Sequence, residues 1–237
     1  MTATNGKDRP ASPSRLVWDL PVRLFHWGLV LAVLGAFITH RLGVKYFDYH
    51  LVCGYAVIVL VVFRIAWGFV GTRHALFTDF VRGPRKTFGH LRAMLRGEDS
   101  SPPGHNPVGG AMVVALLGAL AAQAGLGLFS NDEIFNAGPF AALISPRLSQ
   151  DLSSMHRKLF YGIAIAITAH VAAVLWHQWG KREDLLRPMI TGRKRLEEDH
   201  EGGISSSRLG FAIALILLVT GVLAFAIGHA PAVSGEF

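Results

Sequence analysis

HRKLFYGIAIAITAHVAAVLWH, residues 156–177, is a long and almost uncharged apolar run that carries three histidines. In an α-helix, the fourteen residues from His156 to His170 rise roughly 21 Å and return to within about 40° of the same face. Such a helix crosses most of a bilayer. The segment therefore predicts a transmembrane helix that presents one imidazole near each membrane surface, toward one interior.

The composition of the whole chain is that of a membrane protein. Of its 237 residues, 51% are hydrophobic and 16% are charged, against about a quarter charged in soluble domains. The net charge of +7 does not indicate nucleic-acid binding, because the basic residues lie in blocks between apolar runs. A single cysteine and the absence of a C-x-x-C-H motif exclude an internal disulfide and the usual covalent attachment of c-type haem.

Five apolar segments approach or exceed the length needed to span a hydrocarbon core of about 30 Å. They are 24–39, 51–70, 108–129, 159–176 and 209–228. The first and fourth reach this length only with their histidine-bearing ends, where imidazoles are tolerated if they face a bundle interior. The expected fold is an all-α integral membrane protein in the lipid bilayer, with a four-helix transmembrane bundle and a fifth, C-terminal transmembrane helix.

The charges of the connections predict the orientation of these helices. The connections 71–107 and 179–207 carry six basic residues each, whereas 40–49 carries two and 130–154 carries one. The positive-inside rule places the two basic connections in the cytoplasm. The N-terminus is then cytoplasmic and the C-terminus lies outside. The five tryptophans, at 18, 27, 67, 176 and 179, fall at the predicted cytoplasmic ends, as in an interfacial aromatic belt.

The chain divides into three predicted regions. Residues 1–15 are polar and predict a disordered cytoplasmic tail, 16–192 form the four-helix domain, and 193–237 form a charged linker and the additional helix. Two readings of the basic stretch 86–95 stay open: a short amphipathic helix on the membrane surface, or a solvated loop.

Four histidines fall at paired depths in this topology. His26 and His170 lie toward the cytoplasmic side, and His50 and His156 open their helices on the outer side. Facing imidazoles across an apolar bundle are what a low-spin b-type haem requires. A zinc ion would need its ligands around one point, whereas the helix separates His156 from His170 by most of a membrane. The pattern predicts two non-covalent, bis-histidine haem b sites.

His177 is an alternative partner for His26, since it lies two turns after His170 on nearly the same face. Its position between Trp176 and Trp179 favours an interfacial or propionate-contacting role instead. For most of the remaining histidines in loops or at helix ends, simple solvation is expected. These are His40, His74, His90, His105 and His200.

Several basic residues near the histidine pairs are candidates for contact with a bound haem. Arg64 lies well inside a hydrophobic span, where it either faces an anionic group or snorkels to the headgroups. Arg23 precedes His26 by three residues, and Arg157 and Lys158 follow His156 directly. The last two could hold haem propionates or present a positive mouth to an anionic partner or small anion.

The segment VWDLPVRLFHW at 17–27 resembles the prokaryotic cytochrome b561 group, within the superfamily of the b-type cytochrome subunit of nickel-iron hydrogenases. The resemblance continues through HLVCGY at 50–55, FRIAWG at 63–68, HNPVGG at 105–110 and the spacing of His156 and His170. It covers about residues 15–192. The resemblance implies a four-helix core with two haems, held by His26 with His170 and by His50 with His156.

The resemblance also implies a function in the bacterial cytoplasmic (inner) membrane. Such proteins transfer electrons between membrane quinone and a periplasmic c-type cytochrome or oxidoreductase. The alternative is a superoxide oxidase that reduces ubiquinone without a protein partner. A third hypothesis, outside electron transfer, is a haem-free transporter or structural membrane protein. The fifth helix is absent from the shorter family members, and an oligomer or subunit contact is the role expected for it.

Overall fold

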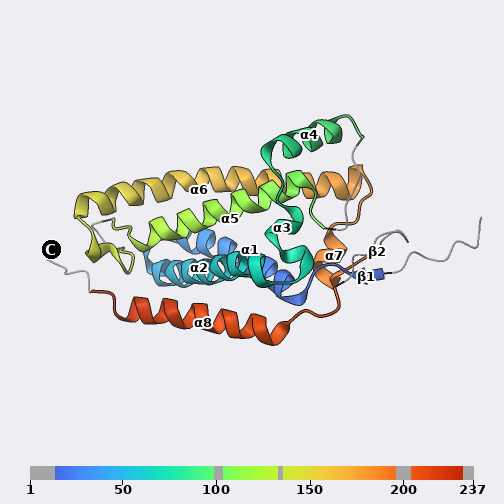
Figure 1. Cartoon of the computed structure of the whole chain (residues 1–237). Coiled ribbons are helices and arrows are strands. Elements are labelled where there is room, and N and C mark those ends of the chain that lie inside the picture. Colours follow the sequence, from blue (N-terminus) through green and yellow to red (C-terminus); the bar gives the residue numbers. More distant parts are fainter. Residues whose placement is uncertain (1–13, 99–103, 133–135, 196–203, 232–237) are drawn as a thin grey trace, which may run out of the picture.

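The computed structural model describes residues 14–98, 104–132, 136–195 and 204–231. Five long helices run side by side along one axis (Figure 1). They are α1 (Leu20–Arg41), α2 (Phe47–Val70), α5 (Pro107–Leu128), α6 (Pro146–Leu175) and α8 (Leu209–Gly228). Each is long and apolar enough to cross a membrane. The five spanning helices predicted from hydropathy are therefore confirmed.

Shorter elements connect these helices. They are the strands β1 (Ser14–Leu16) and β2 (Arg193–Arg195), the helices α3 (Phe77–Phe80), α4 (Pro84–Leu95) and α7 (Leu186–Thr191), the 3-10 turns η1 (Val44–Tyr46), η2 (Arg73–Ala75) and η3 (Ala141–Leu143), and the π-helical turn η4 (Trp176–Gly180). The two strands pair antiparallel, with Ser14 opposite Arg195. This pairing ties the chain before α1 to the segment that follows α7.

Three of the long helices begin at a recognisable sequence signal. The side chains of Asp19, Asn106 and Ser145 accept a hydrogen bond from a backbone N–H in the first turn of α1, α5 and α6. A proline stands in each of these first turns, where its missing N–H costs no helical bond. These caps fix where the transmembrane helices start.

The bundle is built from two helical hairpins and one added helix. α1 packs against α2, α5 packs against α6, and α2 joins the hairpins by packing on α5. The core includes Val61 and Phe63 of α2, Leu117 of α5 and Ile163 of α6. α8 packs on α2 and α1 from outside (Figure 1). Most side chains of α8 are exposed.

The extent of α6 differs from the sequence prediction. The helix begins at Pro146 instead of residue 159, because the Ser145 cap and Pro146 start it within the expected outer loop. His156 therefore lies inside the helix and does not open it. The basic stretch 86–95 forms α4, so the helical reading of that stretch is correct and the loop reading is wrong.

Two of the five tryptophans expected in an interfacial belt lie inside the protein instead. Trp27, Trp176 and Trp179 are exposed, whereas Trp18 and Trp67 are buried. The indole N–H of Trp67 donates to the carboxylate of Asp19, so this ring does not need the polar groups of a membrane interface as partners. The predicted disordered tail also overlaps β1 at residues 14 and 15, and its first thirteen residues lie outside the described part of the chain.

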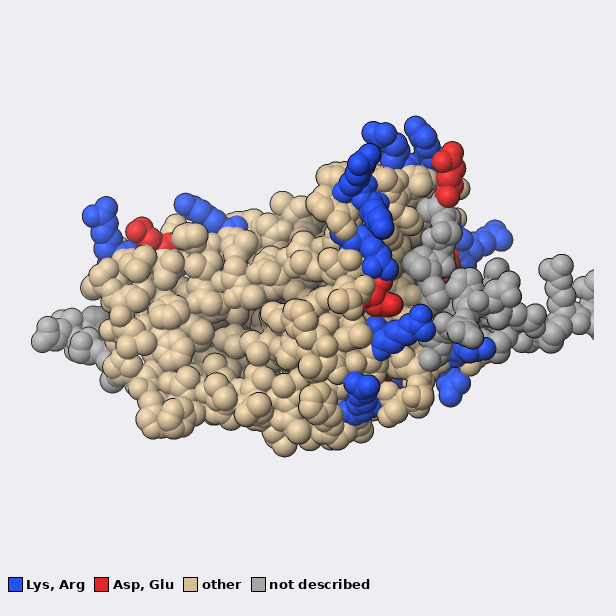
Figure 2. Space-filling view, viewed as in Figure 1, with Lys and Arg blue, Asp and Glu red and all other residues tan. Residues whose placement is uncertain are grey.

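Charged side chains are distributed unevenly along the bundle axis. Figure 2 shows most of the visible Lys and Arg at the end where α4 and the two strands lie, and few at the opposite end. This asymmetry is the spatial counterpart of the loop charges that predict the orientation.

Candidate functional site

His50 of α2 and His156 of α6 face each other near one end of the bundle. Their ring centroids are 6.3 Å apart and the ring planes meet at 82°. Two imidazoles that bind one metal ion from opposite sides, each nitrogen at roughly 2 Å, have centroids about 6 to 6.5 Å apart. The spacing of this outer pair therefore fits a single metal centre between the rings.

Both rings of the outer pair are oriented by backbone carbonyls. His50 Nδ1 lies 2.9 Å from the carbonyl oxygen of Ala36, and His156 Nδ1 lies 2.9 Å from that of Gln123. Because a carbonyl oxygen only accepts, each Nδ1 carries the proton and each Nε2 keeps its lone pair. This is the usual arrangement of a metal-binding histidine.

Glycines leave room around the outer pair. A Cβ atom on Gly127 would lie 3.1 Å from Cε1 of His156, so the ring rests directly on that glycine. A Cβ on Gly54 or Gly162 would meet nothing within 4 Å. α5 thus packs closely on the His156 ring at Gly127, whereas Gly54 and Gly162 adjoin open space.

His40 is a third imidazole at the outer end, where simple solvation was expected for it. It is exposed, but its ring centroid lies 5.9 Å from that of His50. His40 stands in the last turn of α1, and the short connection to α2 brings that turn close to the first turns of α2. This spacing could have predicted that His40 lies near His50.

His26 of α1 and His170 of α6 form the inner pair. The two rings lie within electrostatic reach of each other, and both are partly buried. Nδ1 of His26 is buried and has no hydrogen-bond partner among the described residues. His26 and His170 therefore lie near each other, and among the described residues no carbonyl bond orients either ring.

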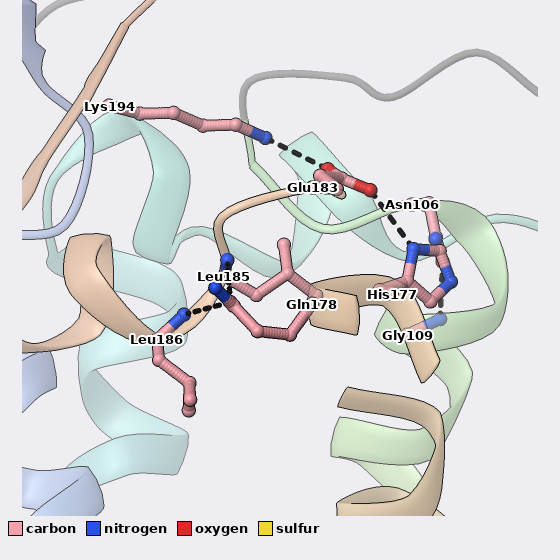
Figure 3. A network of polar contacts seen from close by, with 8 residues as sticks. All are labelled: Asn106, Gly109, His177, Gln178, Glu183, Leu185, Leu186 and Lys194. Carbon is pink, nitrogen blue, oxygen red and sulfur yellow. Dashed lines mark hydrogen bonds and ion pairs between the residues drawn. The ribbon is translucent and has the colours of Figure 1, made fainter. Parts of the chain in front are cut away.

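His177 is held by a carboxylate. It lies in the π-helical turn η4, and its buried ring places Nδ1 2.9 Å from Glu183 Oε2. Glu183 Oε1 accepts from Lys194 Nζ at 3.2 Å, and the neighbouring Gln178 Oε1 accepts from the backbone N–H of Leu185 at 3.0 Å (Figure 3). This network joins the end of α6 to the segment before α7 and to β2.

Arg64 is buried inside the bundle. The residue is only 2% exposed, so the snorkelling alternative is wrong. Its Nη1 donates to the Ala75 carbonyl at 3.0 Å, and the guanidinium lies 5.2 Å and 5.8 Å from the ring centroids of Phe77 and Phe80. The aromatic faces and the carbonyl together compensate for the lost hydration of the cation.

Asp19 is the buried acceptor next to this arginine. It caps α1 through the N–H of Val22 at 2.7 Å and accepts from Trp67 Nε1 at 3.0 Å and from Thr72 Oγ1. Its charge faces that of Arg64. One carboxylate therefore joins the start of α1 to the end of α2 and the turn that follows.

His105 and His74 are enclosed, contrary to the solvation expected for them. The His105 ring lies 4.7 Å from that of Trp18 and 4.8 Å from that of Phe80, and its Nδ1 is buried without a described partner. Burial, followed by the positive charge of Arg64, lowers the pKa of His105 from 6.5 to about 3. His74 is buried and pairs with Asp79 at 3.0 Å. Asn106 caps α5 and Pro107 begins it, so the chain is held in place here. This cap was the feature of the sequence that could have indicated an ordered position for His105.

The remaining basic candidates are placed as follows. Arg23 donates from Nη1 to the Ile190 carbonyl at 2.5 Å, so its guanidinium is already partly engaged. Arg157 and Lys158 are exposed beside His156 at the outer end. They remain available to an external anion.

The chain is similar to several known proteins. The family model described as prokaryotic cytochrome b561 matches residues 17–192. A probable Ni/Fe-hydrogenase B-type cytochrome subunit of Bradyrhizobium diazoefficiens is 23% identical over 226 residues, covering 82% of this chain and 91% of the relative. A protein with the same name from Azotobacter vinelandii is 27% identical over 219 residues, covering 77% and 89%. No solved structure matches the chain.

Proposed function

Because the chain belongs to the prokaryotic cytochrome b561 family, we propose that it is a dihaem cytochrome b that carries electrons between membrane quinone and a periplasmic redox partner. The family establishes the coarser part of this statement: a multi-pass membrane protein that takes part in electron transfer through haem b. The number of haems, their ligands, the quinone and the periplasmic partner are the proposal.

The geometry of His50 and His156 is the observation that carries the proposal. Each Nδ1 donates to a carbonyl, which in the neutral ring leaves Nε2 to bind a metal, and the ring spacing suits one iron. We assign these residues to the outer haem, and His26 with His170 to the inner haem. When bound, haem b supplies an iron that exchanges one electron at a time.

The residues of the chain hold and insulate these sites. The carbonyls of Ala36 and Gln123 fix the outer imidazoles, so that little reorganisation accompanies a change of charge between them. α6 carries one histidine of each pair, and one rigid helix therefore sets the separation of the two sites.

We place the N-terminus in the cytoplasm and the C-terminus in the periplasm of the bacterial inner membrane, following the uneven distribution of Lys and Arg. The candidates for quinone contact at the cytoplasmic end are Arg64, Arg73, His74 and His105. Of these, His105 offers a buried Nδ1 without a described partner, which suits a hydrogen bond with a quinone oxygen. At the outer end, Arg157 and Lys158 suit an anionic partner surface.

A superoxide oxidase is the second candidate function. The exposed Arg157 and Lys158 next to His156 favour it, because they would attract a small anion to the outer haem. This enzyme would pass electrons from superoxide to ubiquinone without a protein partner.

The test begins with the purified protein in detergent. A pyridine haemochrome assay should give two haem b per chain, and a folded protein without haem would support a transporter or structural role instead. The protein is then mixed with superoxide and ubiquinone. Fast haem reduction by superoxide would identify the oxidase, whereas a reaction that needs an added c-type cytochrome would support the electron relay.

A further inference from the structure

The helix α4 presents a basic face that is not used inside the protein. The segment from Arg82 to Glu98 contains five basic residues and one acidic residue. Arg85, Lys86, Arg92 and Arg96 are all exposed. Within the described ranges, no acidic side chain forms an ion pair with any of these four. The face therefore carries uncompensated positive charge.

The spacing of the three arginines gathers them on one side of the helix. Arg85, Arg92 and Arg96 follow one another at seven and four residues, which places them within about 40° around the helix. Leu91 and Met94 point to the other side and are partly buried, where α4 packs on α5. The apolar side of α4 is thus already occupied by the bundle.

Phe88 does not belong to that occupied side. It is 70% exposed and lies about 60° from Arg85 around the helix. A large exposed aromatic ring beside a row of arginines is costly in water, but it suits the boundary between lipid headgroups and acyl chains.

The position of α4 places this face at the level of the headgroups. α4 packs against α5 and lies toward the end of the bundle where the two strands lie (Figure 1), and Figure 2 shows a concentration of Lys and Arg over the same region. α5 is long and apolar enough to cross a membrane and begins at Pro107, so a bilayer around this span would have its headgroups near the level of α4.

From these observations we propose that α4 is an anionic-phospholipid binding surface, in which Arg85, Arg92 and Arg96 contact phosphate-bearing headgroups and Phe88 enters the acyl region. The basic face supplies the charge complementarity. The inference does not depend on the haem ligands or on the direction of electron flow.

The first test counts retained lipid. The full-length protein is reconstituted in nanodiscs of phosphatidylcholine and phosphatidylglycerol, extracted, and examined by native mass spectrometry. We expect Arg85→Gln and Arg92→Gln to lower retention of phosphatidylglycerol about fivefold each. Arg41→Gln and Lys45→Gln, at the opposite end of the bundle, serve as matched controls and should change nothing. Equal retention in all four variants would overturn the proposal.

The second test locates Phe88 directly. A fluorophore is attached to Phe88→Cys in a Cys53→Ser background, and its quenching by iodide in water and by brominated acyl chains is compared. We expect more acyl quenching in discs that contain phosphatidylglycerol than in discs of phosphatidylcholine alone. Equal iodide access in both discs, or shielding that requires a soluble protein extract, would show that the face does not bind lipid.

Discussion

His156 Nδ1 lies 2.9 Å from the carbonyl oxygen of Gln123, and this bond joins α6 to α5. The matching bond of His50 to Ala36 joins α2 to α1. Each imidazole of the outer pair is thus oriented by the partner helix of its own hairpin. A metal centre between the two rings would depend on all four helices.

The outer pair predicts a specific result for two single variants. His50→Ala and His156→Ala should each remove the same haem from the optical and electron paramagnetic resonance spectra, because each deletes one of its two proposed ligands. His40→Ala should keep both haems, although its ring lies 5.9 Å from that of His50. Loss of two different haems in the first two variants would contradict the pairing.

The inner pair is tested in the same spectra by three variants. His26→Ala and His170→Ala should remove the other haem, whereas His177→Ala should retain it, because His177 is bonded to Glu183. An inner haem that is lost in His177→Ala and kept in His170→Ala would exchange the roles of these two histidines.

Gly127 predicts an effect on the outer site without removing a ligand. A Cβ at this position lies 3.1 Å from His156 Cε1, so Gly127→Ala should displace the ring and Gly127→Val should do so further. We expect the outer haem potential to move by on the order of tens of millivolts in a redox titration. Gly118→Ala on the same helix meets nothing within 4 Å and should leave both potentials unchanged.

Asp19 predicts a large loss of stability. Asp19→Ala removes the cap of α1 and leaves the N–H of Trp67 buried without its acceptor, which should cost about 2 to 4 kcal/mol. Thermal unfolding in detergent, followed by circular dichroism, should show the lower midpoint. Asp48→Asn, in the exposed first turn of α2, is the control, and an equal effect in both variants would argue against a special role for Asp19.

The buried ring of His105 predicts a pH dependence. Its pKa is lowered from 6.5 to about 3 in the folded protein, so the unfolded chain binds a proton between these values and the folded chain does not. Stability should therefore fall as the pH drops below about 6.5, by at most about 1.4 kcal/mol per pH unit from this residue. His105→Phe should flatten the decline between pH 6.5 and 4, and the exposed His229→Gln should not. Parallel curves for wild type and His105→Phe would refute the assignment.

Hydropathy predicts the spanning helices well because a bilayer imposes length and composition on each span. It predicts the ends of these helices poorly. α6 starts thirteen residues early because Ser145 and Pro146 cap it, and a cap is a local signal that a hydropathy window averages away.

The histidine pairs could be predicted because their depths follow from helix arithmetic. The polar cluster around Asp19 could not be, since it joins the residues Trp67 and Thr72 to the start of α1 across about fifty positions of sequence. The burial of Trp18, Trp67, His74 and His105 depends on that same junction. From residue type alone, the two tryptophans would be placed at a membrane interface and the two histidines in a solvated loop.

Because α6 is continuous, insertions and deletions between His156 and His170 would alter the relative positions of the two rings. His156 and His170 stand on one uninterrupted helix, so inserting a single residue between them would turn one ring by about 100° relative to the other. Only changes near whole turns, such as seven residues, would restore the common face, and each would also lengthen the separation by about 10 Å. Insertions and deletions in this stretch should therefore be tolerated far less than substitutions.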